Sequence, residues 1–333
     1  MRLRELGLAI GELEPGPLNA ITDVDGVRVG QTTIVEGADV RTGVTVVVPT
    51  LPVFAAPHRL NGNGEMTGLE WIREAGVLES PIAITNTHSV GSVHAALIAY
   101  AQRLEDAPDW SLPVVAETWD GFLNDIDGFH VREEHVFAAL ENAKGGQVAE
   151  GSVGGGTGMV CHGFKGGTGT SSRRAEEWTV GVLVQANHGA RRRLTIDGVP
   201  VGRELGLDQI PGPTRPTGSI IVIVATDAPL LPHQCERLAR RASLGIGRTG
   251  GAGETTSGDL LLAFATGNEL PSEQVAMAPE ERINGLFHAA IEATEEAIVN
   301  AMLGAETMTG FNGNTVHPLD PDLLLETMRR YGR

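Results

Sequence analysis

The chain has 333 residues, a formal net charge of −17 and a pI near 5.0. Hydrophobic residues make up 41% and charged residues 20%, which is typical of a globular protein long enough to bury a substantial core. This excess of negative charge opposes binding to nucleic-acid backbones and to anionic membrane surfaces, so we expect neither as a partner. Acidic patches can still attract a cationic group such as an ammonium.

The first residues, MRLRELGLAIGELEPG, include three glutamates before any apolar run of signal-peptide length has formed. No run in the sequence reaches the length needed to span a bilayer. Cys161 and Cys235 are too few for a disulfide framework and show no metal-ligand spacing. We therefore expect a mature cytoplasmic protein that uses neither a metal nor another cofactor.

Short apolar runs recur along the chain between glycine-rich turns. They are residues 43–50, 80–87, 112–118, 178–187, 219–226 and 259–266. Because the runs are short, often β-branched and almost unbroken in apolarity, they indicate strands covered on both faces. Such strands require layers that flank the sheets.

Three helical patterns supply those layers. Residues 92–105 form the first, and the second is expected to start after Asp227 with Pro229 in its first turn. The third, within 279–302, repeats apolar residues with a period of 3.6 on one face. Strands interleaved with helices predict an α/β protein with two stacked sheets between helical layers. The proline-rich stretch 210–218 resembles a linker.

Several motifs do not support the function that they first suggest. The G-x-G-x-x-G at 245–250 follows a helix instead of a strand, and the glycine-rich stretch 151–172 lacks the G-K-[ST] of a phosphate-binding loop. We expect the latter to form turns in which backbones approach closely. A calcium loop at 123–134 would start on a leucine, and His130 and His135 lack the H-E-x-x-H pattern of zinc sites.

The apolar run 219–226 begins with Ser219, directly after Gly218. The sequence has no G-x-S-x-G elbow, so an ordinary serine hydrolase is unsupported. A serine at a chain terminus can instead be activated by its own α-amine, whose unperturbed pKa is about 7.7 to 8.0. Gly218 suits this chemistry, because glycine tolerates the strained geometry in which the hydroxyl attacks the preceding carbonyl. A flexible loop that meets a buried strand is the alternative interpretation.

Seven stretches resemble the L-aminopeptidase/D-esterase (DmpA-type) family, which includes β-peptidyl aminopeptidases. In order along nearly the whole chain, they are GPLNAITDVDGVRVGQTT, TNTHSVG, VVAETWDGFLND, GGGTGMVCHGFKGG, VGVLVQANHG, GSIIVIVATDAPLLPHQ and TTSGDLLLAF. The resemblance implies a single domain, residues 1–333, that cuts itself between Gly218 and Ser219 into an α chain, 1–218, and a β chain, 219–333. It also implies a homotetramer of the two-chain protomer.

The fold implied by the resemblance is a four-layer αββα sandwich, in which two mixed sheets lie between helical layers. This arrangement is similar to that of N-terminal-nucleophile hydrolases but differs in strand connectivity. It agrees with the covered strands that the apolar runs predict.

The resemblance also implies roles for individual residues. Ser219 resembles the nucleophile of self-cleavage and turnover, and Asn187 resembles the asparagine that stabilises the oxyanion. Ser257 and Asp259 resemble a serine and an acidic residue beside the nucleophile, and residues two apart in an extended segment face the same side. Glu117 resembles the acidic residue that holds the free amino group of the substrate. Turns after strands and an ion pair with an arginine are the ordinary structural interpretations of these residues.

Two points about the mechanism stay open. A carboxylate at Asp259 would raise the pKa of a neighbouring α-amine, so either that amine or Ser257 is the group that activates Ser219. The tyrosine that some family members have near the nucleophile has no counterpart, because Tyr100 and Tyr331 lie outside the matching stretches. Trp119 lies close by in the sequence but has no hydroxyl.

The sequence thus predicts a metal-independent, self-processing aminopeptidase or amidase that acts on small peptides, amides or esters through an acyl-enzyme. A non-catalytic small-molecule binding protein on the same fold is one alternative, and an acyltransferase that passes the acyl group to an amine is another. L-α, D-α and β-amino acyl substrates are not distinguished, because they differ only in stereochemistry or by one methylene.

Overall fold

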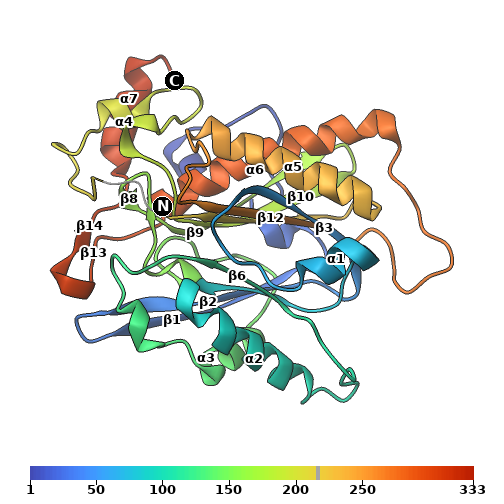
Figure 1. Ribbon diagram of the computed structural model, residues 1–333. Helices are drawn as coiled ribbons and strands as arrows, with labels where there is room; N and C mark the ends of the chain where they lie inside the picture. The colour runs from blue at the N-terminus through green and yellow to red at the C-terminus, as the bar shows by residue number, and fades with distance from the viewer. Residues whose placement is uncertain (215–217) are drawn as a thin grey trace.

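The computed structural model describes residues 1–214 and 218–333, and in these ranges two mixed sheets lie face to face (Figure 1). The four-stranded sheet contains, in spatial order, β1 (Arg28–Glu36), β2 (Val40–Val48), β5 (Ile82–Asn86) and β6 (Val114–Thr118). The six-stranded sheet contains β4 (Val77–Leu78), β3 (Val53–Gly62), β12 (Gly258–Ala265), β11 (Ile220–Thr226), β10 (Trp178–Ala186) and β9 (Gly167–Ala175). The pairs β5–β6 and β11–β12 are parallel, and the other pairs are antiparallel.

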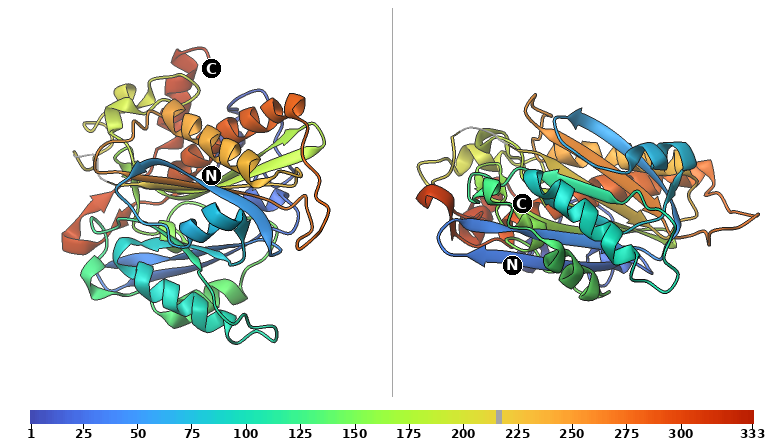
Figure 2. Two further views of the ribbon diagram at one scale, coloured as in Figure 1. Left: turned by 45° about the vertical axis from the view of Figure 1, so that its right-hand side comes forward. Right: turned by 60° about the horizontal axis from the view of Figure 1, so that its bottom comes forward.

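Helices cover the outer face of each sheet, as the views in Figures 1 and 2 show. The six-stranded sheet carries α5 (Pro232–Arg248) and α6 (Ile283–Leu303), and the four-stranded sheet carries α2 (Val90–Ala101) and α3 (Glu133–Glu141). The remaining elements are α1 (Leu69–Ala75), α4 (Val201–Glu204), α7 (Pro321–Arg330), and the short pairs β7 (Val160–Cys161) with β8 (Phe164–Lys165) and β13 (Met308–Thr309) with β14 (Thr315–Val316). The predicted αββα sandwich is therefore confirmed.

Three apolar layers hold the sandwich together, and β11 lies between two of them. Ile220, Val222 and Val224 face the layer under α5 and α6, whereas Ile221 and Ile223 face the layer between the sheets. A third layer packs α2 and α3 onto the four-stranded sheet. Every residue of β11 is buried, which explains why its sequence is apolar without alternation.

The structure differs from the expected elements in several places. Strands β1, β3 and β9 were not predicted: β1 and β9 lie at sheet edges and are rich in polar residues, and β3 contains Pro57. The expectation of turns throughout 151–172 was therefore wrong from residue 167 onward. The expected helix after Asp227 begins only at Pro232, because Asp227 instead accepts a hydrogen bond from the Thr179 backbone across the sheet.

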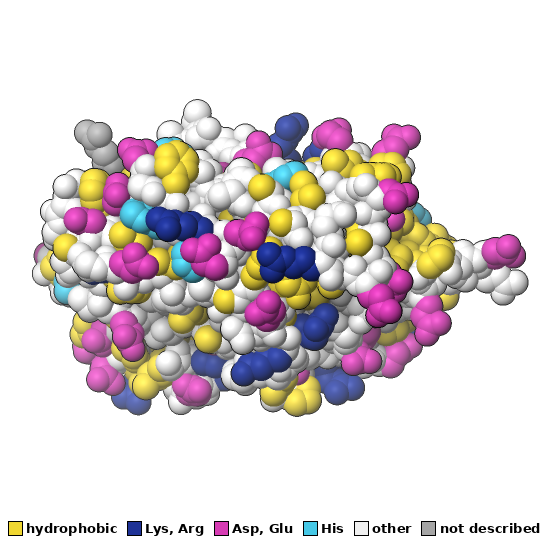
Figure 3. Space-filling view, turned by 90° about the horizontal axis from the view of Figure 1, so that it is seen from below, with side chains coloured by type: hydrophobic (Ala, Val, Ile, Leu, Met, Phe, Trp, Pro, Cys, Tyr) yellow, Lys and Arg dark blue, Asp and Glu magenta, His cyan; other side chains and the backbone are white. Residues whose placement is uncertain are grey.

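The sequence analysis made expectations about the surface charge, about membrane-spanning segments and about a linker at 210–218. Seen from the side of α2 and α3, basic and acidic side chains are both scattered over the surface among apolar ones (Figure 3). None of the helices in the described ranges combines the length and apolarity needed to cross a membrane. The expected linker 210–218 includes residues 215–217, which lie outside the described residues.

Candidate active site

Strand ends from both sheets meet at one end of the sandwich, where they carry the predicted site residues. β10 ends just before Asn187, and β11 and β12 begin just after Ser219 and Ser257. Because β10 is antiparallel to β11 while β11 is parallel to β12, these three ends are neighbours. The Asn187 side chain donates a hydrogen bond to the Trp119 carbonyl, which follows β6 of the other sheet. Four of the elements predicted from the sequence therefore build the site.

Ser219 is buried at the start of β11, with 4% of its surface exposed. Its Oγ accepts a hydrogen bond from the backbone N–H of Gly258 at 2.9 Å. The preceding residue, Gly218, has a φ of +122°. A Cβ added there would lie 1.7 Å from the backbone oxygen of Asn187 and 2.5 Å from its Nδ2 atom. Both the backbone angle and the packing thus require glycine, and the Gly218–Ser219 junction lies directly against Asn187.

The amide of Asn187 is held at both ends. Its Oδ1 accepts from the Val160 backbone N–H at 2.7 Å, and its Nδ2 donates to the Trp119 carbonyl at 2.7 Å. Its own backbone N–H also donates to the Ser219 carbonyl at 3.1 Å. These bonds fix the orientation of the side chain, which is the preorganisation required of a group that stabilises developing negative charge.

Ser257 and Asp259 face the same side of the chain, as their spacing predicts. The Ser257 hydroxyl donates to Asp259 Oδ1 at 2.5 Å, and both side chains are buried. Burial raises the pKa of Asp259, although hydrogen bonds from Ser257 and from the Ile220 backbone act in the opposite direction. The carboxyl group therefore lies beside the residue that follows Ser219.

The turn that carries Ser257 is held by asparagines that the sequence analysis did not single out. Asn61 Nδ2 donates to the Glu254 carbonyl at 2.5 Å, and Asn63 Nδ2 donates to the Thr256 carbonyl at 2.9 Å. Their sequence, Asn-Gly-Asn-Gly at 61–64, is a turn signal that could have identified this loop, but not the segment that it supports.

Glu117 lies near the same turn, at the end of β6. Its Oε1 accepts from the Glu65 backbone N–H at 2.9 Å, and its Oε2 accepts from the Thr87 hydroxyl. Burial raises the pKa of Glu117, and these two hydrogen bonds oppose that rise. A Cβ added at Gly64 would lie 3.1 Å from Glu117 Oε1 and 3.0 Å from the Cα of Gly258, so only a glycine separates this carboxyl from the backbone that binds Ser219.

The structure places the two tyrosines outside this site. Tyr100 packs on Phe137 with 5.4 Å between ring centroids, and the Tyr331 hydroxyl donates to Glu204 at 2.9 Å. Trp119 contributes its backbone carbonyl to the site through Asn187. The described residues around Ser219 therefore offer no phenol, as the sequence indicates.

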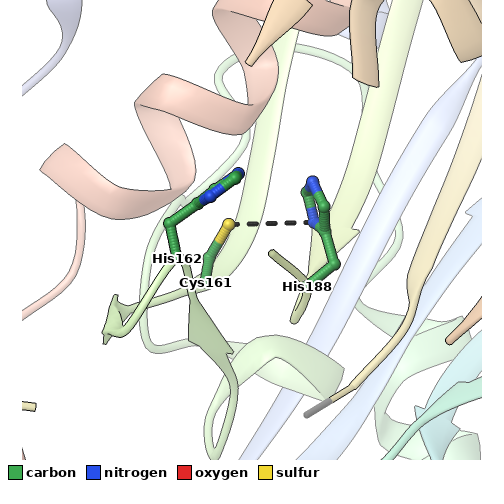
Figure 4. A group of neighbouring side chains, drawn as sticks. All are labelled: Cys161, His162 and His188. Atoms are coloured by element: carbon green, nitrogen blue, oxygen red, sulfur yellow. Dashed lines mark hydrogen bonds between the residues drawn. The ribbon is translucent and has the colours of Figure 1, made fainter. Parts of the chain in front are cut away.

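A second buried cluster lies directly behind Asn187. This cluster contains Cys161, His162 and His188. His188 follows Asn187 in the chain, and Cys161 follows Val160, whose backbone N–H binds the Asn187 side chain. The Cys161 Sγ lies 3.8 Å from His188 Nδ1, and the rings of His162 and His188 are 5.1 Å apart (Figure 4). Burial raises the pKa of Cys161 to about 12, lowers that of His162 to about 4 and lowers that of His188.

Comparisons with known proteins agree with the geometry. A model of Peptidase family S58 matches residues 19–316. The Beta-peptidyl aminopeptidase BapA of Sphingosinicella microcystinivorans is 46% identical over 100% of this chain and 93% of its own length. The solved structure of a Burkholderia sp. beta-aminopeptidase is 51% identical with a TM-score of 0.94, over 100% of this chain and 99% of that one.

A third relative bears on the fold. The L-aminopeptidase D-Ala-esterase/amidase of Ochrobactrum anthropi is 46% identical with a TM-score of 0.91, over 100% of this chain and 99% of that one. That protein is described as a prototype for the serine aminopeptidases and as a new variant among the Ntn hydrolase fold. The predicted family resemblance and fold class are thus confirmed.

Proposed function

The chain belongs to peptidase family S58, and on that premise we propose that it is a self-processing serine aminopeptidase or amidase. Its substrates would be small peptides, amides or esters with a free N-terminal amine. The observation that carries the proposal is the Gly218–Ser219 junction packed against a fixed asparagine amide. The metal-independent mechanism follows from a serine nucleophile, and the expected homotetramer and cytoplasmic location stay predictions.

Self-cleavage would begin when the Ser219 hydroxyl attacks the carbonyl carbon of Gly218. The peptide C–N bond breaks, its nitrogen becomes the α-amine of Ser219, and water then hydrolyses the ester that remains. The products are chains 1–218 and 219–333. Asn187 supports this step, because its Nδ2 lies beside Gly218, where negative charge develops on the carbonyl oxygen.

Turnover would use the same hydroxyl on a substrate carbonyl, with the new α-amine as general base. Burial raises the pKa of Asp259, and hydrogen bonds from Ser257 and from the Ile220 backbone oppose that rise. Ser257 would orient Asp259 through their hydrogen bond. The α-amine is the base in this proposal, and Ser257 is the alternative base.

Glu117 would hold the ammonium of the substrate. The carboxyl is buried and close to the backbone that binds Ser219, so a charge-assisted hydrogen bond there would position the first residue of a substrate. Two relatives carry beta-aminopeptidase names, so we include β-amino acyl groups among the proposed substrates, beside L-α and D-α ones.

A denaturing mass spectrum with N-terminal sequencing tests the proposal. We expect two polypeptides, the second beginning Ser219-Ile220-Ile221, together with hydrolysis of amino-acid p-nitroanilides. Ser219→Ala should stay one chain and be inactive, whereas the exposed control Ser272→Ala should be processed and active. A processed and active Ser219→Ala protein would overturn the assignment.

The same assay separates the alternatives. An intact wild-type chain without hydrolysis would favour a small-molecule binding protein. A new amide formed in the presence of an amine acceptor would identify an acyltransferase, because hydrolysis releases the free acid instead.

A further inference from the structure

We propose that Cys161, His162 and His188 form a binding site for one Zn²⁺ ion, and that the ion inhibits the enzyme from directly behind Asn187. Neither the family assignment nor the proposed reaction uses these side chains. Figure 4 shows them converging from two neighbouring segments, β7 with its following residue and the residue pair after β10.

The donor set and its spacing fit zinc. One sulfur and two imidazole nitrogens are ligands that Zn²⁺ prefers, and three protein ligands leave the fourth tetrahedral position open. One ligand atom from each residue lies within 4.8 Å of the others, and the Cys161 Sγ to His188 Nδ1 distance is 3.8 Å. With Zn–S near 2.3 Å and Zn–N near 2.0 Å, the edge of a tetrahedron between sulfur and nitrogen is about 3.5 Å. This pair is therefore close to the ligated geometry.

The hydrogen bonding of His162 is that of a metal ligand. Its Nδ1 lies 3.2 Å from the Ala190 carbonyl, which fixes the proton on Nδ1 and leaves the Nε2 lone pair free. Among the described residues, neither His162 Nε2 nor His188 Nε2 has a hydrogen-bond partner, although both rings are buried. Buried polar atoms without a partner are costly, and a bound cation would satisfy the free lone pair of His162 Nε2, while His188 would bind through the Nδ1 that already faces Cys161 Sγ.

The binding step balances without a redox change. Zn²⁺ replaces the thiol proton of Cys161, which is released to solvent, and accepts lone pairs from two neutral imidazoles. Lys165 lies behind the cysteine, where its Nζ donates to the Gly166 carbonyl at 2.9 Å, and burial lowers its pKa to about 7, so this lysine can be neutral when the ion binds. The site thus carries one negative charge against the two positive charges of the ion.

Inhibition follows from the place of the ligands in the chain. Cys161 and His188 are bonded directly to Val160 and Asn187, so closing their 3.8 Å separation to the about 3.5 Å of a zinc tetrahedron would pull on both of these residues. Val160 N–H and the Asn187 amide form the 2.7 Å hydrogen bond that orients the oxyanion donor. A misplaced amide would stabilise the transition state less, so the loss should appear in kcat.

A titration of the metal-free, purified protein with Co²⁺ tests the site independently of hydrolysis. We expect one equivalent of Co²⁺ to produce a thiolate-to-cobalt charge-transfer band that Zn²⁺ then abolishes. Cys161→Ser should lose the band and bind Zn²⁺ at least tenfold more weakly. The matched control is Cys235→Ser, which replaces the other buried cysteine and should behave as the wild type.

X-ray absorption at the zinc edge of the wild-type protein gives a readout that needs no variant. One sulfur and two nitrogen ligands would support the site. Coordination by nitrogen and oxygen alone would place the ion elsewhere, for example at the exposed pair His88–Asp127 or the half-buried pair His130–Asp125, and would overturn the proposal.

The inhibitory part has its own test. Zn²⁺ should lower the kcat of the wild type and of Cys235→Ser at least tenfold, reversibly with a chelator, and should affect Cys161→Ser far less. Zinc that binds through sulfur while kcat stays unchanged would refute the coupling to Asn187.

Discussion

Two buried polar clusters lie back to back at one end of the sandwich, and they differ in how their polar atoms are satisfied. In the cluster around Ser219, the side chains of Asn187, Ser257 and Asp259 all take part in hydrogen bonds. In the cluster around Cys161, the Nε2 atoms of both histidines have no partner among the described residues. Burial is nearly complete in both.

This difference matches the two roles proposed above, a reactive site around Ser219 and a metal-binding site around Cys161. A satisfied network holds donors in place before the substrate arrives, so little reorganisation is needed at the transition state. An unsatisfied buried group costs about 1–3 kcal/mol, which a ligand with matching chemistry can recover.

The largest effect is expected at the Gly218–Ser219 junction. Gly218→Ala would place a Cβ 1.7 Å from the Asn187 backbone oxygen, so the junction must move away from the oxyanion donor. We expect the precursor to remain a single chain in a time course followed by denaturing mass spectrometry. The control Gly198→Ala also has positive φ, at +78°, but no described atom within 4 Å, and should be cut normally. Wild-type cleavage of Gly218→Ala would show that the contact is unimportant.

The next effect concerns the oxyanion donor itself. Asn187→Asp keeps an acceptor for Val160 but loses the N–H donor, so self-cleavage should slow, and the kcat of the processed enzyme should fall about 10²- to 10³-fold with a smaller change in KM. Asn268 is a matched control, because its buried amide also donates to and accepts from the backbone, at Ala276. Equal losses in Asn187→Asp and Asn268→Asp would mean that Asn187 has only a structural role.

A smaller effect is expected where the substrate ammonium would bind. Glu117→Gln keeps the shape of the side chain but removes its charge, so kcat/KM for substrates with a free amine should fall about 10- to 100-fold. The kcat/KM of Glu117→Gln for substrates with an acylated amine should equal that of the wild type. The exposed neighbour variant Glu65→Gln should hydrolyse both substrate classes like the wild type. An equal loss on both substrate classes would contradict the assignment.

Asp120 is buried with only one of its two carboxylate oxygens hydrogen-bonded to the described part of the chain, and we expect it to affect stability. Its Oδ1 accepts from Asn124 at 3.1 Å, whereas its Oδ2 has no partner in the described ranges. Burial raises the pKa of Asp120 to about 7. Between pH about 4 and 7 the folded protein therefore holds a proton that the unfolded chain has lost, and stability falls as pH rises through this window.

Asp120→Asn removes that pH dependence. Relative to the wild type, the variant should gain stability from pH 5 to pH 8, by up to about 3 kcal/mol in chemical unfolding. The exposed control Asp127→Asn should follow the wild type. Parallel stability curves for wild type and Asp120→Asn would show that Asp120 is ionised throughout.

The strands that could be predicted share one property, which is burial on both faces. β10, β11 and β12 appear in the sequence as apolar runs because each lies between two apolar layers. β1 and β9 lie at sheet edges, where polar and small residues are tolerated, so the same criterion misses them. The helix α6 was predictable because its apolar stripe repeats with the helical period.

The sequence by itself determined the order of the apolar runs, the Gly218–Ser219 junction and the motifs that carry the family resemblance. Only the tertiary structure decided which distant residues meet. Glu117 and Ser257 approach the same glycine turn at 61–64, and the His162 backbone N–H donates to the His188 carbonyl at 2.7 Å, which brings the two histidines together. These contacts depend on strand register and on the packing of one sheet against the other, which local periodicity does not encode.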